Sequence, residues 1–437
     1  MTDCTFSGLE FPVCRKRRVE ADFSGGDITS NGGVLLLRQV DRLSGLTPSV
    51  ARRLTDARQK GKVEHRFAAM LRQRVFALAL GYEDVNDHAD LRHDLALQTA
   101  AERDRALASP STLSRFENAA GRDWAKSIHE VLVNNFIASH LESPEELILD
   151  FDATDDAVHG RQVGRFFHGY YDHYCFLPLY VFCGERLLVS YLRPSKIDGA
   201  KHAWAILSLL VKRLRQAWPG VRIVFRGDSG FCRHRMLSWC ERHGVGYIVG
   251  LAKNARLDDL AASWMETAAK GFEISGVKQR RFGELRYAAG TWKTERRVIA
   301  RIEHGAKGAN PRYIVTNLDG EAQDLYENLY CQRGDMENRI KEQQLDLFAD
   351  RTSCHGWWAN QFRLLLSSMA YALIETIRRL GLAGTEMARA QAGTIRLKLL
   401  KIGAVIVRNT RRVRVHLSSA CPDKALFMLV AERLTPG

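Results

Sequence analysis

The sequence lacks the features that would place a protein outside the cell or in a membrane. Its nine cysteines form no C-x-x-C pair, so the paired spacing of a structural zinc site is missing. No secretory signal peptide leads the sequence, and no apolar run approaches the roughly 20 residues of a membrane span. These absences predict a soluble cytoplasmic protein with reduced thiols and no membrane partner. The cysteines lie at positions 4, 14, 175, 183, 232, 240, 331, 354 and 421.

Acidic residues are also too few to balance the basic ones. The chain has 437 residues, with 64 Lys and Arg against 50 Asp and Glu, so its formal net charge is +14. A surplus of this size favours a polyanionic partner, with nucleic acid first among the candidates. A basic protein without such a partner is the alternative. The length predicts two to four domains.

Hydrophobic residues recur at helical spacing in the first third of the chain. They are separated by three or four positions, and basic or polar residues occupy the other faces. We therefore expect residues 1–143 to form a helical, basic N-terminal domain, with a plain helical bundle as the alternative. The apolar positions are Val63, Phe67, Met70, Leu71, Val75 and Leu78.

From residue 144 the pattern changes to strands and alternating helices. Residues 147–152 (LILDFD) form a short apolar run broken by carboxylates, as expected for a buried strand that reaches a site. Three strands followed by alternating helix and strand predict a mixed sheet with helices on both faces. This is the order that an RNase H-like core requires, over 144–250. The expected elements are strands at 147–152, 176–182 and 186–192, a helix at 199–218, a strand at 222–225, and a helix and strand within 232–249.

The rest of the chain divides into three further segments. Residues 251–311 contain alternating strand patterns at 281–287 and 296–303, which predict a β-rich insertion. The core resumes over 312–380 with a strand and a helix running from about 322 past 344. Residues 381–437 are expected to form a small basic C-terminal domain, because 378–417 hold ten Lys or Arg and a single acid. Arg411 and Arg412 are its candidate phosphate contacts.

Three acids come from separate predicted elements. Asp152 ends the first core strand, Asp228 follows a later strand, and Glu337 lies on the long helix. Two-metal phosphodiester cleavage needs oxygen ligands that converge on ions about 4 Å apart, and sites form at strand ends in helix-covered sheets. These acids are therefore the candidate catalytic and metal-binding residues, for two Mg²⁺ ions or Mn²⁺ in their place. Asp150 is the alternative first acid, but it lies deeper in the strand, where an unpaired carboxylate is costly.

The long helix presents a row of polar side chains around Glu337. Tyr330, Arg333, Glu337 and Lys341 step by three, four and four residues, so they line one face. Arg333 and Lys341 are expected to hold DNA phosphates, Arg333 through a bidentate fork, and Tyr330 to hydrogen-bond a neighbouring phosphate. The alternative is an ordinary charged face with i to i+4 pairing.

The combination of these motifs resembles a known family. Tyr330-x-x-Arg333-x-x-x-Glu337, followed by a lysine, resembles the Y-R-E-K signature of cut-and-paste transposases from bacterial insertion sequences. Residues 81–87 (GYEDVND), 151–156 (FDATDD) with 159–162 (HGRQ), and 226–231 (RGDSGF) resemble segments of the insertion-sequence thirteen-eighty family. The resemblance covers roughly residues 20 to 417. In the signature the lysine comes seven residues after the glutamate, and that position here is Gln344. We therefore assign the role of the signature lysine to Lys341, four residues after Glu337.

The resemblance implies a DDE (Asp-Asp-Glu) transposase with an RNase H-like catalytic core and a β-rich insertion between the second and third acids. Such an enzyme would bind the terminal inverted repeats of its element, nick DNA by two-metal hydrolysis and transfer strands to target DNA. It would act as a homodimer in the synaptic complex, in the bacterial cytoplasm and on the nucleoid when bound to DNA. The alternatives are an RNase H-like nuclease or resolvase without strand transfer, and an inactive DNA-binding repressor.

Related transposases also stack a flipped base on a tryptophan in the insertion, at about 1–3 kcal/mol per base. Trp292, beside Lys293 and between two predicted strands, is the first candidate for this role, and Trp264 is the second. Packing of Trp292 under a β-turn is the alternative.

Overall fold

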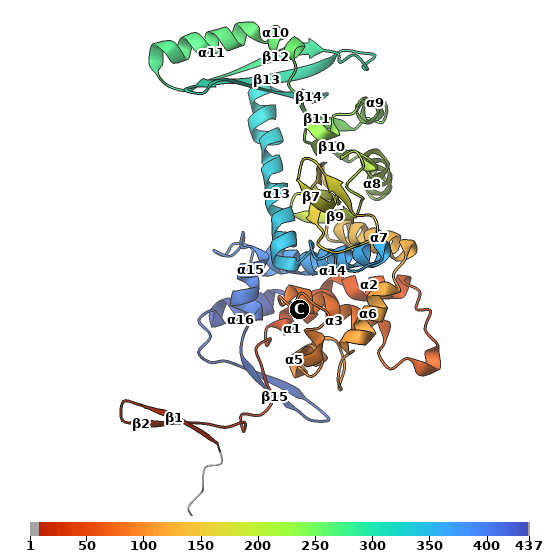
Figure 1. Cartoon of the computed structure of the whole chain (residues 1–437), viewed down its shortest axis with the longest axis vertical. Coiled ribbons are helices and arrows are strands. Elements are labelled where there is room, and N and C mark those ends of the chain that lie inside the picture. Colours follow the sequence, from red (N-terminus) through yellow and green to blue (C-terminus); the bar gives the residue numbers. More distant parts are fainter. Residues whose placement is uncertain (1–7, 436–437) are drawn as a thin grey trace, which may run out of the picture. The chain divides into compact units, whose positions relative to one another are not determined.

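The structure is a computed structural model that describes residues 8–435 (Figure 1). Cys4 and the outermost residues of both predicted terminal domains lie outside the described residues. The chain divides into two compact units. The first combines the chain up to Leu43 with Asp56–Ser114 and the chain from Thr376, and the second combines Ser44–Thr55 with Arg115–Glu375. The N-terminal and C-terminal segments therefore fold together.

The first unit is mainly helical. A three-stranded sheet has the order β16-β15-β3, so a C-terminal hairpin pairs with an N-terminal strand. Gly32 and Gly33 allow the N-terminal segment to pack closely against the C-terminal segment, since a Cβ on Gly33 would lie 1.9 Å from the Leu399 carbonyl oxygen. The elements are β1 (Leu9–Cys14), β2 (Arg17–Ala21), β3 (Ile28–Thr29), α1 (Val34–Ser44), α3 (Phe67–Ala79), α4 (His88–Leu91), α5 (Leu95–Ala100), α15 (Ala392–Ile395), β15 (Ala404–Arg408), β16 (Val413–Leu417) and α16 (Lys424–Arg433), with α6 (Pro110–Asn118) shared by both units.

The predicted N-terminal helix is present but shorter than its apolar spacing suggested. Helix α3 begins at Phe67, and Arg66 before it is extended, with φ −60° and ψ 144°. Val63 therefore lies outside the helix, after a short 3₁₀ turn at Lys60–Lys62. The other five apolar positions are in α3.

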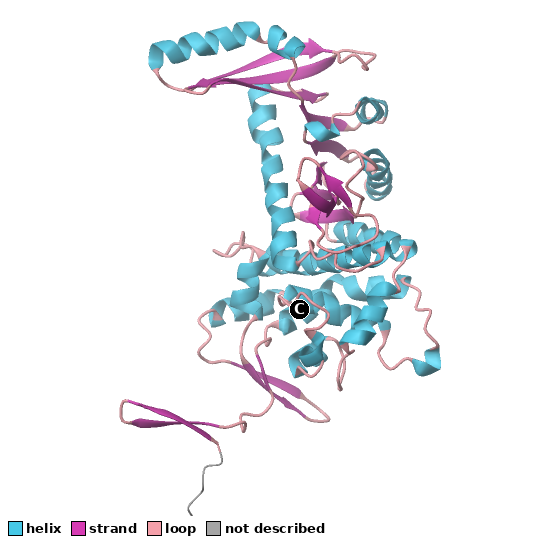
Figure 2. Cartoon of the chain, viewed as in Figure 1, coloured by secondary structure: helices cyan, strands magenta, loops and turns pink. Residues whose placement is uncertain are grey.

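The second unit is built on an eight-stranded mixed sheet with the order β12-β13-β14-β11-β10-β4-β8-β9 (Figures 1 and 2). The neighbours β4, β10 and β11 are parallel, and the other pairs are antiparallel. The predicted α/β class is therefore confirmed at the level of a large mixed sheet with helices. The strands are β4 (Glu146–Ala153), β8 (Leu179–Cys183), β9 (Arg186–Tyr191), β10 (Arg222–Gly227), β11 (Gly246–Leu251), β12 (Gln279–Tyr287), β13 (Arg296–Gly305) and β14 (Gly308–Thr316).

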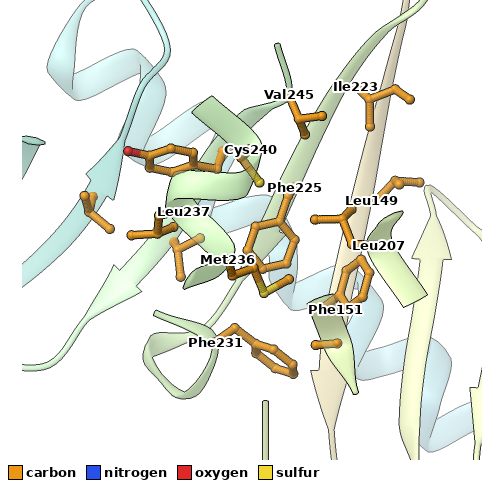
Figure 3. Close-up of a cluster of buried hydrophobic side chains, with 14 of the residues drawn as sticks. Leu149, Phe151, Leu207, Ile223, Phe225, Phe231, Met236, Leu237, Cys240 and Val245 are labelled. Carbon is orange, nitrogen blue, oxygen red and sulfur yellow. The ribbon is translucent and has the colours of Figure 1, made fainter. Parts of the chain in front are cut away.

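Buried apolar side chains fill the space between this sheet and its helices. Figure 3 shows Leu149 and Phe151 of β4 facing Phe225 of β10, with Met236 and Leu237 of α9 packed beside them. The Phe151 and Phe225 rings meet edge to face at 5.2 Å, a preferred aromatic geometry. This core holds the two central strands that end at the candidate acids. The helices of the unit are α2 (Leu46–Arg53), α7 (Arg122–Ala138), α8 (Ala203–Ala217), α9 (His234–Arg242) and α14 (Trp357–Thr376), besides those named below.

The predicted insertion differs from expectation in two ways. Its strands β12 and β13 are present, but β14 joins them to β11, so they extend the main sheet. Two helices, α10 (Ala255–Leu260) and α11 (Ala262–Ser275), precede the strands and were not expected. Helix α11 packs on the sheet core through Ala268, which is buried, and through the partly buried Trp264 and Met265 on the same helix face.

The long predicted helix is confirmed as a continuous helical run over 322–346 (Figure 2). It contains α12 (Ala322–Asp324) and α13 (Gly334–Lys341), and its hydrogen bonding widens to the π pattern at Leu325–Tyr330 and Glu342–Asp346. Such widenings often occur at functional sites. No helix of residues 8–435 is long and apolar enough to span a membrane.

A small second sheet follows β4 directly. Its order is β5-β7-β6, with β5 (Asp156–Ala157), β6 (Phe166–His168) and β7 (His173–Phe176). The predicted strand at 176–182 is therefore split, with Phe176 ending β7 and Leu179 beginning β8.

Candidate active site

The carboxylates of β4 have different surroundings. Asp150 is 2% exposed and accepts hydrogen bonds from Arg226 of the neighbouring strand β10, with the Arg226 Nη2 atom 2.7 Å from Asp150 Oδ2. The same guanidinium donates to the Leu329 carbonyl. Asp150 is thus a buried ion-pair partner that ties both central strands to the 322–346 helix. Asp152, nearer the strand end, has no such partner on β10.

Asp228 lies just past the end of β10 and caps the turn that follows. Its Oδ1 atom accepts a hydrogen bond from the Gly230 amide at 2.9 Å. The space beside it depends on Gly250 of β11, where a Cβ would lie 2.7 Å from both the Tyr330 hydroxyl and the Ser229 nitrogen. A glycine is therefore required there for Tyr330 to approach Asp228. The sequence reasoning missed Gly250, which no local pattern distinguishes.

Arg333 lies between the first and third acids. Its Nη2 atom donates to Glu337 Oε1 at 2.5 Å, and its Nη1 atom is 3.5 Å from Asp152 Oδ2. The side chains of Arg333 and Asp152 are 17% and 15% exposed, and that of Glu337 is 44% exposed. The predicted helix face is therefore brought to the end of β4.

The three acids share one electrostatic environment. Burial raises the pKa of Asp152 to about 6; the Arg333 charge opposes this rise, and the negative charges of Asp228 and Glu337 add to it. The acids in turn help to raise the pKa of Arg333 against the opposing effect of its burial. Clustered, partly buried carboxylates of this kind are a favourable environment for a cation.

Oxygen donors of this kind fit a divalent metal ion in their chemistry. Mg²⁺ prefers carboxylate oxygens and is commonly held by only one or two of them. Within residues 8–435, however, no group of three His, Cys, Asp or Glu side chains is arranged around one point. The Arg333 guanidinium lies between Asp152 and Glu337 in this conformation. Moving that one side chain would free two of the three acids.

The remaining predicted residues of the helix differ in their contacts. Tyr330 packs against Tyr326 at a ring distance of 5.5 Å and points towards Gly250. Lys341 is exposed, one turn beyond Glu337. Gln344 instead donates from Nε2 to the Asp155 carbonyl at 2.9 Å, so the residue at the signature's lysine position contacts the segment after the first acid.

The two tryptophans of the insertion pack on its strands. Trp292 meets the Tyr287 ring edge to face at 5.7 Å, and the Arg296 guanidinium lies 4.8 Å from its ring centre. Trp264 covers Gly283, where a Cβ would lie 2.4 Å from the indole. These contacts support the packing interpretation of Trp292, and its stacking on a base stays a prediction.

Arg411 and Arg412 lie in the turn between β15 and β16 of the first unit. Their backbone amides donate to the Asn409 side chain at 3.0 and 2.9 Å, and both residues are exposed. The turn is thereby shaped by Asn409, which leaves two cationic side chains in solvent.

Comparison with known proteins gives one match over almost the whole chain. The family described as "Transposase DDE domain group 1" matches residues 11–436. No curated protein matches the sequence. Among solved structures, the chain is similar to a piggyBac transposase in a synaptic complex with hairpin DNA, determined by cryo-electron microscopy. The TM-score is 0.45 and the identity 10%, over 84% of this chain and 79% of that chain.

Proposed function

We propose, from the premise that this chain belongs to the DDE-domain transposase family of group 1, that Asp152, Asp228 and Glu337 are its catalytic acids. The protein is a transposase, and hence an enzyme that cleaves and joins DNA. The observation that carries the assignment is the convergence of the three acids: Asp228 and Glu337 both influence the ionisation of Asp152, and Arg333 bridges Asp152 to Glu337.

The five strands that carry the site support an RNase H-like core. Taken in spatial order they are β9, β8, β4, β10 and β11. Strands β4, β8 and β9, which come first in the sequence among these five, pair antiparallel. Strands β10 and β11 follow, and they are parallel to β4 and connected through helices. Three strands followed by alternating helix and strand is the succession on which the sequence expectation rested.

Family members generally use divalent metal ions, and we propose two Mg²⁺ ions here, with Mn²⁺ as a substitute. Bound ions would activate the attacking oxygen and stabilise the leaving oxygen at the scissile phosphate. Asp152, Asp228 and Glu337 would hold them. Arg333, released from the carboxylates, would bind a DNA phosphate with its guanidinium fork. Tyr330 would donate a hydrogen bond from its hydroxyl to a neighbouring phosphate of the same DNA strand. Lys341 would add a point charge along the backbone.

The finer assignments follow from the sequence motifs. We place the enzyme in the insertion-sequence thirteen-eighty group with a Y-R-E-K helix. It would recognise terminal inverted repeats, cut them in a homodimeric synaptic complex and transfer the ends to target DNA. The basic segments 1–143 and 381–437 would supply phosphate contacts, including Arg411 and Arg412.

The test is strand cleavage of DNA carrying the ends of the element, with and without Mg²⁺. Asp152→Asn, Asp228→Asn and Glu337→Gln nearly preserve side-chain shape but each remove a ligand charge. Each should reduce nicking and joining by at least about 100-fold, and the losses should not add, because the acids serve one site. Binding to the ends should persist without metal. Asp335→Asn, an exposed change on the same helix, is the matched control and should cleave normally.

The outcomes separate the alternatives. Full cleavage by Glu337→Gln would contradict the assignment of the third acid. Nicking without joining by the unmodified protein would favour a nuclease or resolvase. End binding without cleavage, with every metal tried, would favour an inactive repressor.

A further inference from the structure

A hairpin next to the candidate acids exposes aromatic rings. This aromatic hairpin comprises residues 166–176, which are β6, β7 and the loop that joins them. Its Phe167, Tyr170 and Tyr174 side chains are 53%, 85% and 48% exposed. Rings of this size are normally buried, and a group of them in solvent indicates a contact surface.

The rings are exposed because of the hairpin's register. Phe167 and Tyr174 are directly opposite across the two strands, and their rings meet edge to face at 5.7 Å. Side chains alternate between faces along a strand, so Phe166 and its partner Cys175 point to the opposite, less exposed side. In the loop, Asp172 adopts a left-handed conformation with φ 57°, and Tyr170 stands edge-on to Tyr171 at 5.0 Å.

The backbone beneath the rings is held in place. The Ser195 hydroxyl donates to the Phe166 carbonyl at 2.8 Å, and the Val158 amide donates to the Tyr174 carbonyl at 2.9 Å. The Asp172 amide closes the loop by donating to the His168 carbonyl at 2.8 Å. A surface with a fixed backbone loses little conformational freedom when a ligand binds to it.

A cationic side chain accompanies the exposed rings. The Arg165 guanidinium lies 4.5 Å from the centre of the Tyr174 ring. On the opposite face of the hairpin, the Lys196 ammonium lies 4.4 Å from the centre of the Phe166 ring. Asp172, in the loop, is the single acidic residue of the hairpin segment 166–176. Aromatic faces beside cations suit a ligand that has both flat rings and negative charges, as a nucleic-acid strand with unpaired bases does.

The hairpin lies close to the candidate acids. Strand β5 begins four residues after Asp152 and pairs with β7. The Nε2 atom of His173 lies 2.9 Å from Asp155 Oδ2. Burial first, and then the charges of Asp155 and Asp152, raise the pKa of Tyr171 to about 12. A DNA strand bound at the candidate acids would therefore lie close to the hairpin on the side of Asp155.

We propose that the aromatic hairpin binds unpaired DNA bases next to the cleavage position, with Tyr170 as the main stacking side chain. The proposal rests on the proposed function for the position of the cut, but the surface and its ligand class rest on the hairpin itself. Tyr170 is better suited than Trp292 or Trp264, because packing within the insertion covers parts of both indoles.

The test is binding of a short single-stranded oligonucleotide that contains 2-aminopurine, measured without metal, beside a duplex of equal length. Stacking on Tyr170 should quench the 2-aminopurine fluorescence. Tyr170→Ala should weaken binding of the single strand about tenfold, as expected for the loss of one stacked base at about 1–3 kcal/mol. Duplex binding should change by less than about twofold, because a paired base offers no free ring face. Tyr170→Phe keeps the ring and should behave like the unmodified protein.

Leu209→Ala is the matched control, because it removes another exposed apolar side chain, 67% exposed, from helix α8, outside the hairpin. It should leave single-strand binding unchanged. Equal affinities of Tyr170→Ala and the unmodified protein for the single strand would overturn the proposal, as would equal losses for single strand and duplex. This binding assay is separate from the cleavage assay of the proposed function. Single-strand binding through Tyr170 in a protein that never nicks DNA would refute the proposed function and not this inference. Normal nicking, with no effect of Tyr170→Ala on single-strand binding, would refute only the inference.

Discussion

Gln344 donates a hydrogen bond to the backbone carbonyl of Asp155, at 2.9 Å from Nε2 to the oxygen. The contact joins the end of the 322–346 helix, which carries Glu337, to the segment that follows Asp152. Asp155 is also the residue that His173 of the aromatic hairpin approaches. Gln344 thus occupies the position of the signature lysine and acts as a donor within the protein.

Replacing Gln344 tests whether this contact positions the first acid. Gln344→Ala removes the donor, so we expect a loss of about 1 kcal/mol in the free energy of unfolding and slower nicking with unchanged end binding. Gln344→Lys keeps a donor and should retain more activity. Urea unfolding and single-turnover nicking measure the two effects, and the exposed Gln332→Ala is the control. Unchanged nicking by Gln344→Ala would contradict a positioning role.

The pairing of Asp150 with Arg226 predicts that replacing the two aspartates of β4 changes the free energy of unfolding differently. Asp150→Asn leaves a buried guanidinium without its counter-charge, which typically costs about 3–5 kcal/mol. Asp152→Asn should leave the free energy of unfolding unchanged or higher, because burial already disfavours its charge. Adding Arg226→Gln to Asp150→Asn should recover part of the loss in a double-mutant cycle. Additive losses would show that the ion pair is not energetically coupled.

Asp156 should make the stability of the protein depend on pH. Burial raises its pKa well above the usual range; the Thr352 hydroxyl opposes this, and the charges of Asp350 and Asp155 add to it. A carboxyl with a raised folded pKa binds its proton more tightly in the folded state. Its stabilising effect is therefore full below about pH 4, the unfolded value, and is lost as pH rises through the folded pKa.

Asp156→Asn should flatten this part of the stability profile. At pH 8 the variant should be more stable than the unmodified protein, by about 1.4 kcal/mol for each unit by which the folded pKa is raised. Urea unfolding between pH 4 and 8 measures the difference, with the exposed Asp319→Asn as the control. Parallel profiles for Asp156→Asn and the unmodified protein would contradict the prediction.

The exposed cations at the β15–β16 turn predict salt-sensitive binding. If Arg411 and Arg412 contact phosphates, the logarithm of affinity should fall with the logarithm of salt concentration by about 0.9 per phosphate contacted. Reversing both charges to Glu should reduce that slope and weaken binding to all sequences about equally. Lys307→Glu, an exposed change in the β13–β14 turn, is the control. A slope that does not change on reversal would exclude the turn from the interface.

Local sequence patterns predicted the elements that carry the acids. The alternation of apolar residues and carboxylates in 147–152 predicted β4 with Asp152 near its end, and the three- and four-residue steps from Tyr330 to Lys341 predicted one helix face. These features are local, because side-chain periodicity follows from the backbone geometry of a single strand or helix. The same reasoning did not predict α11, although Trp264, Met265 and Ala268 recur there at helical spacing.

Which of these residues come into contact depends on how distant segments pack. The register of β4 against β10 puts Arg226 beside Asp150 rather than Asp152, and a shift by one residue would exchange the faces of the strand. Arg333 reaches both Asp152 and Glu337 because the helix lies against β4. Strands β3 and β15, at least 375 positions apart in the sequence (404 minus 29), join one sheet. Such pairings depend on the packing of distant segments, for which a single sequence contains no local signal.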